Sequence, residues 1–307
     1  MNILDVAILV QAVRMSTPLL FGAIAEVYAE RAGVMVTAIE GIFLMGAWSG
    51  FVGAYYSGSL VVGFLMAMGC GLLTAALYGF ICIGLKQHQV VTGTAINILM
   101  AGLCSFLSRV IFGVPLMPLT VEPLAALPIP LLSQIPVLGP VFFNQNILTY
   151  ALYVLVPLSW FVLFRTSIGL TIRSAGENPE AVDVAGINVN LVRFVTVLFA
   201  GAAGGLAGAF YSIGYLGMFT DTIIGGRGWI AFAICFLGNW NPRGAAIGGL
   251  VFGLAEAFAI YMQASGRSLF PNELLIALPY ILTIVLTITR KSFNVPAQLG
   301  IPYGKER

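Results

Sequence analysis

Long apolar segments follow one another through almost the whole chain, and short polar turns separate them. A helix needs about 20 apolar residues to cross the hydrocarbon core of a bilayer. Only 8% of the 307 residues are charged, against about 25% in an average soluble domain, so the chain cannot cover a water-facing surface. The sequence therefore predicts an all-α integral membrane protein with one transmembrane domain over residues 1–307.

The apolar segments predict a polytopic bundle of about nine (eight to ten) transmembrane helices. We expect some of these helices to be broken. The second is interrupted at Glu40–Gly41, and the seventh is short enough to be a re-entrant helix. The segments cover residues 3–25, 34–56, 60–85, 93–112, 147–164, 194–216, 229–237, 245–264 and 274–289.

The Lys and Arg residues are distributed unequally between the two ends of this predicted bundle. With the polar stretch of residues 165–193 placed in the cytoplasm, ten of them fall in inside loops, whereas only Arg227 and Arg267 fall in outside loops. Cytoplasmic loops of membrane proteins carry an excess of Lys and Arg. We therefore expect the N-terminus outside, the C-terminus inside, and the Pro-rich loop of residues 113–145 outside.

The polar stretch contains the signals of a short helix between Gly176 and Ile187. Asn178 is a good N-cap, and Pro179 suits the first helical position. Glu180 and Asp183 lie early in the helix, where its dipole favours negative charge. Gly186 can adopt the left-handed conformation that ends a helix. A capped helix this short cannot cross a membrane, so we expect a docking element.

Several classes of site are excluded by what the sequence lacks. The four cysteines, which lie within apolar runs without metal-ligand spacing, read as small core residues, and His88 is the only histidine. We therefore expect no metal site and no Ser-His catalysis. No Walker A motif is present, and the net charge of +2 is too small to favour nucleic acid. A cleaved signal peptide is also not expected, because no basic region precedes the first apolar segment.

Two glycine-rich runs, residues 201–208 and 244–253, contain several G-x-x-x-G pairs. A dinucleotide-binding loop would need a preceding strand and a helix that starts in water, and both are missing. We interpret the runs as places where helices pack closely in the membrane.

Charges within the predicted spans cost about 2.5–3.5 kcal/mol each at a helix centre, so each needs a reason. Arg14, Glu40, Arg109 and Glu256 are in this position. Glu40 precedes Gly41, where an unwound helix would line a cavity, so it suits a substrate contact as well as a structural ion pair or helix cap. Arg109 and Glu256 suit structural roles. The predicted spans contain no paired acids at helical spacing.

Two regions of the chain resemble each other weakly. R-A-G-V at Arg31 leads to G-A-W at Gly46, and R-G-W-I at Arg227 leads to G-N-W at Gly238. In the predicted topology the first run heads outward and the second inward, as in an inverted repeat. The spacings differ, so chance similarity remains an alternative to a repeat.

The run E-A-V-x-x-x-G, from Glu180 to Gly186, resembles the E-A-A-x-x-x-G loop of permease subunits of binding-protein-dependent ABC importers. The surrounding G-E-N-P-E-A is similar to the form found in permeases for branched-chain amino acids, simple sugars and nucleosides. The chain departs from the general signature at Val182, which replaces the second alanine, and in lacking an I-x-L-P tail after Gly186.

Three further motifs extend the resemblance over most of the chain. They are E-R-A-G-V-x-x-x-x-x-E-G from Glu30 to Gly41, V-V-T-G-x-x-x-N from Val90 to Asn97, and G-N-W-N-P-R-G from Gly238 to Gly244. The first is most similar to the simple-sugar and nucleoside branch, in particular to the shorter of two permeases in nucleoside importers.

The resemblance implies a permease without catalytic activity of its own, in the bacterial cytoplasmic (inner) membrane. Its partners would be a second, different permease, a cytoplasmic ATPase that uses ATP and Mg, and an external solute-binding protein; this chain would bind no cofactor. The family's coupling helix, which fits a cleft of the ATPase, maps onto one group of residues. These are Gly176, Glu177, Asn178, Pro179, Glu180, Ala181, Asp183 and Gly186.

The solute is expected to be a nucleoside, with a simple sugar or a branched-chain amino acid as alternatives. Nucleosides need aromatic stacking and hydrogen bonds, which Phe43, Trp48, Asn97 and Glu40 could supply, although a sugar pathway would use similar residues. An ion-coupled secondary transporter is the main alternative from another class. It would need ion-binding acids within the spans, and Glu40 and Glu256 are its candidates.

Overall fold

A computed structural model describes residues 3–114, 117–265, 271–289 and 292–304. Helices make up most of this part of the chain, and the strands β1 and β2 form one short antiparallel pair. The all-α class predicted from the sequence is confirmed.

The elements in chain order are α1 (Ile3–Arg31), α2 (Ile39–Ser57), α3 (Leu60–Gly79), the π-helical turn η1 (Phe80–Gly84), α4 (Gln89–Phe112), β1 (Leu127–Pro128), the 3-10 turn η2 (Leu132–Gln134), α5 (Leu138–Phe142), β2 (Asn144–Gln145), α6 (Ile147–Arg165), α7 (Ser167–Glu177), α8 (Pro179–Val184), α9 (Val189–Ala209), the π-helical turn η3 (Phe210–Leu216), α10 (Arg227–Leu237), α11 (Pro242–Ser265) and α12 (Asn272–Thr289).

Six helices in the described residues are long and apolar enough to cross a membrane, fewer than the nine predicted segments. They comprise Val6–Arg31, Leu60–Gly84, Gln89–Phe112, Ile147–Arg165, Val189–Leu216 and Pro242–Ala264. The other three predicted segments correspond to α2, α10 and α12. Of these, α10 and the 277–289 part of α12 are apolar but shorter than a full crossing.

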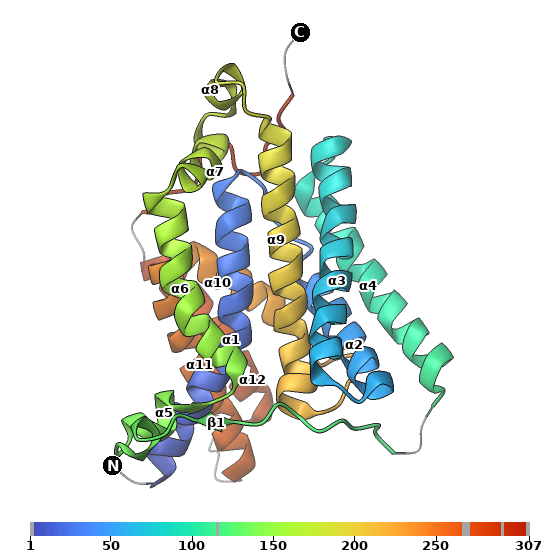
Figure 1. Ribbon diagram of the computed structural model, residues 1–307, viewed down its shortest axis with the longest axis vertical. Coiled ribbons are helices and arrows are strands. Elements are labelled where there is room, and N and C mark those ends of the chain that lie inside the picture. Colours follow the sequence, from blue (N-terminus) through green and yellow to red (C-terminus); the bar gives the residue numbers. More distant parts are fainter. Residues whose placement is uncertain (1–2, 115–116, 266–270, 290–291, 305–307) are drawn as a thin grey trace.

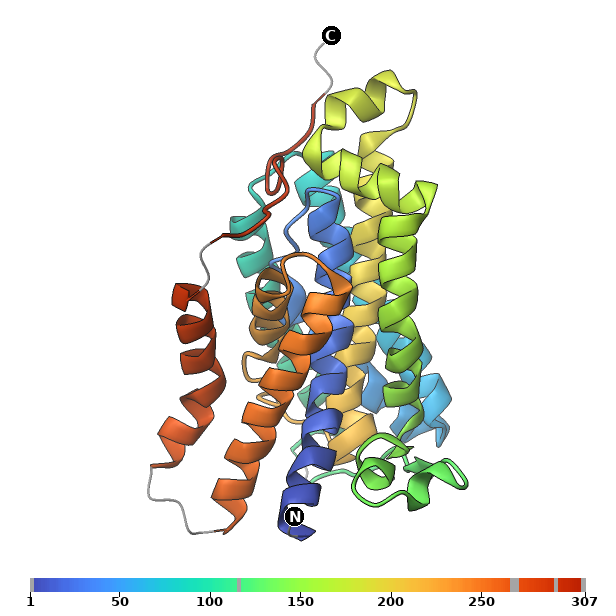
Figure 2. The same ribbon diagram turned by 90° about the vertical axis from the view of Figure 1, so that its left-hand side faces the viewer.

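The two most buried spans, α1 and α9, form the centre of the bundle and run in opposite directions (Figure 1). α1 packs against α9, α10 and α11, whereas α9 packs against α1, α2 and α3. α7, α8 and the C-terminus lie at one end of the molecule, which we call the docking end. The N-terminus, α5 and β1 lie at the other end (Figure 1). α11 and α12 stand on one side of α1 (Figure 2).

Both glycine-rich runs lie at close helix contacts, as predicted. A Cβ added to Gly205 of α9 would lie 2.2 Å from the Ala67 carbonyl oxygen of α3. A Cβ added to Gly253 of α11 would lie 2.5 Å from the Ala12 carbonyl oxygen of α1. Because only hydrogen fits in these places, the backbones approach each other as small residues allow in membranes.

Two boundaries in the first part of the chain differ from the prediction. α1 does not end near residue 25 but continues to Arg31, so it includes Glu26 and Glu30. These side chains are one helical turn apart, and both are fully buried. The prediction that the spans contain no paired acids at helical spacing is therefore wrong. The break in the second segment precedes Glu40: residues 32–38 are not helical and α2 begins at Ile39. We call residues 32–38 the α1–α2 corner.

Candidate docking site

The predicted short helix is present as α8, with the caps that the sequence predicts. The side-chain oxygen of Asn178 accepts a hydrogen bond from the Ala181 N–H at 3.1 Å, and Pro179 occupies the first helical position. Gly186 adopts a left-handed conformation with φ of 82°. This pattern of local hydrogen bonds ends the helix after Val184. α8 therefore projects from the docking end as a rod with defined ends (Figure 1).

The two faces of α8 differ in their surroundings. Pro179 and Val182 are buried, and Val182 packs with Ala175 of α7 and Val189 of α9. Glu180 and Val184 point outward, and Val184 is 89% exposed. The replacement of the family's second alanine by Val182 therefore faces this chain's own core. The replacement changes how α8 packs on α7 and α9 and leaves the exposed face of α8 unaltered.

The sequence analysis missed helix α7, which joins the span α6 to α8. Its N-cap is Thr166, whose hydroxyl accepts a hydrogen bond from the Gly169 N–H at 3.2 Å. Gly169 lies against the end of α6, because a Cβ there would be 2.1 Å from the Val162 carbonyl oxygen. The Thr166 cap was visible in the sequence and could have signalled this helix. We call α7 and α8 together the docking unit.

The docking unit lies directly on the end of α1. A Cβ added to Gly176 would lie 2.2 Å from the Arg31 carbonyl oxygen and 3.0 Å from the Gly33 nitrogen. Beside this contact, the Arg31 guanidinium lies 3.9 Å from a carboxylate oxygen of Glu177. Two motifs that are about 140 residues apart in the sequence are thus in contact, and glycine is required at the point of closest approach.

The motif G-N-W-N-P-R-G, from Gly238 to Gly244, contacts the same end of α1 through Trp240. Arg31 donates from Nε to the Trp240 carbonyl oxygen at 2.9 Å. The fully buried Trp240 donates its indole N–H to the Glu30 carboxylate. Glu26, one turn earlier on α1, is also fully buried, and neither of its oxygens has a hydrogen-bond partner among the described residues. The end of α1 is therefore bound to the turn that follows α10.

The motif V-V-T-G-x-x-x-N, from Val90 to Asn97, contacts the α1–α2 corner from α4. Asn97 of α4 accepts a hydrogen bond from the Gly41 N–H at 2.8 Å and donates one to the Thr37 carbonyl oxygen at 2.9 Å. Gly93, one turn earlier, lies against Thr37 so closely that a Cβ would be 2.0 Å from its hydroxyl. All four motifs thus meet around the corner between α1 and α2.

Glu40 lies inside the bundle, where the first turns of α2 and α10 meet. Its two carboxylate oxygens accept hydrogen bonds from the Gly226 N–H at 2.7 Å and the Gly228 N–H at 2.8 Å. A carboxylate in this position satisfies orphan N–H groups of a helix and interacts favourably with its dipole. Both oxygens of Glu40 are therefore used as a cap for α10.

Arg227 is not in an outside loop, as the charge count assumed, but pairs with Glu256 of α11. The distance between Arg227 Nε and the Glu256 carboxylate is 2.6 Å. The structural role expected for Glu256 agrees with this ion pair. Arg227 therefore leaves the outside count, and four of the ten residues counted inside, Arg290, Lys291, Lys305 and Arg307, lie outside the described residues. The other outside residue, Arg267, lies outside the described residues.

The remaining pathway candidates are packed in the core. Phe43 is fully buried and Trp48 is 8% exposed, both in one cluster between α1, α2 and α9. In the part of the chain that the structure describes, the indole nitrogen of Trp48 has no hydrogen-bond partner. The structure thus places Glu40, Phe43, Trp48 and Asn97 on two neighbouring helices, although two of the four side chains already bind backbone groups.

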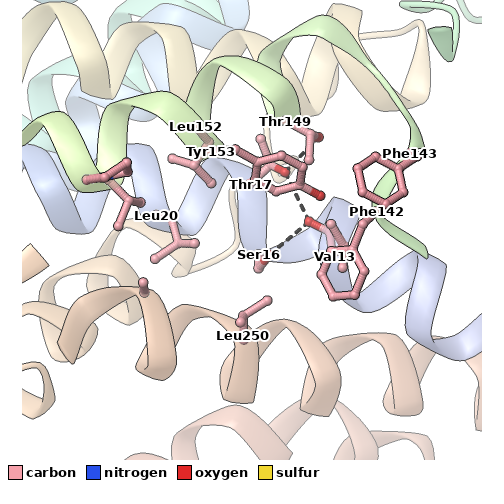
Figure 3. Close-up of a pocket in the computed structure, with 13 residues that line it drawn as sticks. Val13, Ser16, Thr17, Leu20, Phe142, Phe143, Thr149, Leu152, Tyr153 and Leu250 are labelled. Carbon is pink, nitrogen blue, oxygen red and sulfur yellow. Dashed lines mark hydrogen bonds between the residues drawn. The ribbon is translucent and has the colours of Figure 1, made fainter. Parts of the chain in front are cut away.

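A cavity of about 430 Å³ lies between α1, α6 and α11 (Figure 3). Three of its hydroxyl groups are already bonded: Ser16 donates to the Val13 carbonyl oxygen, and Thr17 lies 2.9 Å from the hydroxyl of Thr149. A second cavity, of about 280 Å³, is lined by Arg227, Glu256 and other residues of α10, α11 and α12. None of the four pathway candidates lines either cavity.

The model of a family described as "Branched-chain amino acid transport system / permease component" matches residues 8–287. The chain belongs to this family. It is 36% identical over 301 residues to the nucleoside ABC transporter permease protein NupC of Lactococcus lactis, and the match covers 95% of each chain.

The guanosine ABC transporter permease protein NupQ of Bacillus subtilis is also 36% identical, over 94% of each chain. Another guanosine permease protein of the same organism, NupP, is 23% identical, over 94% of this chain and 83% of its own length. Like these relatives, the chain is a multi-pass membrane permease of the ABC transporter class.

Proposed function

We propose that this chain is the translocation subunit of an ATP-driven nucleoside importer in the bacterial cytoplasmic membrane. The observation that carries the proposal is α8, a capped rod with an outward face at one end of a membrane bundle, within a chain of the permease family. The sequence offers no nucleotide site of its own. Energy from ATP therefore has to arrive through a contact with another protein.

In this proposal α8 is the coupling helix. Its exposed residues, Glu180, Ala181 and Val184, would enter a cleft of the ATPase. Gly176, Glu177, Asn178, Pro179, Asp183 and Gly186 would set its position and its ends. Closure of the ATPase on ATP would then displace the docking unit as a rigid body, and the bundle would alternate between outward-facing and inward-facing states.

The partners follow from this role. The ATPase, with its ATP and Mg, would lie on the docking side, and a solute-binding protein would deliver the solute at the opposite end. The second permease would have a different sequence. This is supported by the two guanosine permease proteins of B. subtilis, which resemble the chain to different degrees, 36% and 23%.

The proposed topology has about nine crossings, with the N-terminus outside and the C-terminus inside. The six long helices would be completed by α2, α10 and α12 as partial crossings. An inverted repeat is supported by direction and packing. In both α1 to α4 and α9 to α12, a long helix is followed by a helix that starts inside the bundle, and the two pairs run in opposite directions (Figures 1 and 2).

A nucleoside is the favoured solute because the two relatives at 36% identity are named for a nucleoside and for guanosine. Glu40, Phe43, Trp48 and Asn97 remain the proposed pathway residues, since they lie on two neighbouring helices, α2 and α4. Uptake of a labelled nucleoside with competition by other nucleosides, ribose or leucine tests this choice. Competition by ribose or leucine alone would identify a sugar or an amino acid permease instead.

The coupling role is tested by the double change Glu180→Ala with Gly186→Pro, because proline cannot adopt the positive φ of Gly186. We expect normal membrane insertion, but no solute uptake and no solute-stimulated ATPase activity in proteoliposomes that contain the whole complex. Glu122→Ala, a loss of charge in the opposite loop, serves as the control and should transport normally. Normal uptake by the double variant would refute the coupling role.

The buried pair Glu26 and Glu30 is an observation that favours the ion-coupled alternative, because such transporters hold acids within their spans. Vesicles that contain this chain without an ATPase or a binding protein separate the two functions. Uptake driven by a proton or sodium gradient alone would support the secondary transporter. The proposed function predicts no uptake under these conditions.

A further inference from the structure

The side chain of Arg193, in the first turns of α9, is only 2% exposed and binds three separate parts of the chain. It donates to the Ala32 carbonyl oxygen at 3.0 Å, to the Ala175 carbonyl oxygen at 3.3 Å and to the Ile301 carbonyl oxygen at 2.8 Å. These acceptors belong to the α1–α2 corner, to the last turn of α7 and to the C-terminal segment. One guanidinium group thus joins three segments that are far apart in the sequence.

The acceptors of Arg193 are available because two helices end here. The Ala175 carbonyl would normally bind the N–H four residues later, but that residue is Pro179, which has no N–H. Ala32 directly follows the last residue of α1. Within the described residues Arg193 forms no ion pair. Its charge is instead opposed by the negative ends of two helix dipoles.

The C-terminal segment, residues 294–303, connects the same two places. The Gln298 N–H donates to the Gly176 carbonyl oxygen at 2.8 Å, and the Gly300 N–H donates to the Gly33 carbonyl oxygen at 3.1 Å. The Ala297 N–H donates to a carboxylate oxygen of Glu177 at 3.2 Å. The segment therefore binds the end of α7 on one side and the corner on the other, beside Arg193.

The other contacts between the docking unit and α1 include apolar packing, because buried Ile172 of α7 lies in one cluster with Val27 and Ala32. The ion pair between Arg31 and Glu177 is 3.9 Å long, and the Glu177 side chain is half exposed, so its contribution is small. The close contact at Gly176 resists compression but does not resist separation. Arg193 and the C-terminal segment supply most of the directed hydrogen bonds that would pull the corner along with α7.

We propose that Arg193 is a positioning residue for energy coupling. Arg193 and the C-terminal segment together join the end of α7 to the α1–α2 corner, and we call these two parts the clamp. This inference rests on the proposed docking role of α8. Movement of α8 would pass through α7 to Arg193, then to the corner, and from there to the start of α2, where Glu40 meets α10. Without the clamp, the ATPase would still bind α8 and hydrolyse ATP, but the spans would not follow.

The test measures solute taken up per ATP hydrolysed, in proteoliposomes that contain the complete importer. For Arg193→Met we expect this ratio to fall about tenfold, within the usual range of coupling between sites. Arg193→Lys should recover part of the loss, because an ammonium group keeps three donors. Ile301→Ala is the matched control, since the Ile301 side chain is 51% exposed and its carbonyl oxygen is retained.

A second variant covers the possibility that Arg193→Met does not fold. A chain that ends at Val295 keeps Arg193 and its bonds to Ala32 and Ala175 but loses the C-terminal half of the clamp. We expect the uptake ratio of this chain to fall in the same direction and by a smaller factor. An unchanged ratio in both variants, with normal assembly, overturns the proposal.

Crosslinking separates this inference from the proposed function. Val184→Cys places a thiol on the exposed face of α8, and it should crosslink to the ATPase both with Arg193 and with Arg193→Met. If the crosslink forms in both and the ratio stays unchanged, only the clamp is refuted. If it never forms with Arg193 in place, the docking role of α8 is refuted, and the clamp with it.

Discussion

The two helices that begin inside the bundle, α2 and α10, receive their first-turn hydrogen bonds in different ways. In α2 the neutral amide of Asn97 binds the Gly41 N–H, and the amide also belongs to a neighbouring helix, α4. In α10 the carboxylate of Glu40 binds two N–H groups, those of Gly226 and Gly228. The amide joins α2 to α4, the next membrane-length helix but one in the chain, whereas the carboxylate joins α2 to α10, which lies far away in the sequence.

This difference shows where the bundle is most sensitive to change. A charged acceptor forms stronger hydrogen bonds than a neutral one, and its loss leaves more buried N–H groups without partners. The start of α10 should therefore tolerate less change than the start of α2. Four predictions test this comparison.

The largest effect is expected for Gly228→Ala. The added Cβ would lie 2.6 Å from a Glu40 carboxylate oxygen and 2.7 Å from the Glu40 Cα, so the backbones of α2 and α10 would have to separate. We expect a loss of about 3 kcal/mol or more, at the upper end of overpacking effects. Thermal unfolding of the purified chain in detergent measures it. Gly102→Ala on α4, where the Cβ meets open space, is the control and should cost little.

Glu40→Gln should have the next largest effect. The amide keeps one acceptor oxygen but turns an NH₂ group toward one of the two N–H donors, and it removes the charge. We expect a loss of about 2–3 kcal/mol, the value of hydrogen bonds to a charged group. Thermal unfolding measures the stability, and Glu122→Gln in the exposed loop is the control.

The same variant also decides between a cap and a solute contact. A capping role lowers the amount of folded permease and leaves the KM for the solute unchanged. A solute contact raises the KM at unchanged stability, and this result would restore Glu40 to the pathway.

Asn97→Ala should cost less than Glu40→Gln. It leaves the Gly41 N–H and the Thr37 carbonyl oxygen without this partner, and both groups are neutral. We expect a loss of about 1–2 kcal/mol in thermal unfolding. Asn190→Ala on the exposed surface of α9 provides the reference. A larger loss for Asn97 than for Glu40 would reverse the comparison between the two caps.

The smallest effect is expected for Gly41→Ala, the counterpart of Gly228→Ala at the start of α2. Its Cβ would lie 3.0 Å from the Asn97 side-chain oxygen and 3.1 Å from the Asn97 Cα, so a shift of a few tenths of an ångström relieves the contact. We expect about 1 kcal/mol, with Gly69→Ala on α3 as the control. Equal losses for Gly41 and Gly228 would show that the two starts are equivalent.

Local sequence signals predicted the short helix α8 well and the membrane helices only in part. Asn178, Pro179 and Gly186 act through hydrogen bonds and backbone preferences within a few residues, so α8 was visible before any tertiary structure. The end of α1 was placed too early, at residue 25, directly before Glu26. Their burial depends on segments distant in the sequence: Trp240 donates to Glu30, and residues of α3 and α10 pack beside this part of α1.

The apolar pattern by itself determined that this chain is a helical membrane protein, and the caps by themselves determined the short helix at the docking end. Both features depend on interactions between residues that are close in the sequence. Tertiary structure alone decided that Glu40 caps a helix 186 residues away and that Arg193 binds three distant carbonyl groups. Such partners are chosen by which chain segments pack together, and an isolated charge in the sequence does not specify them.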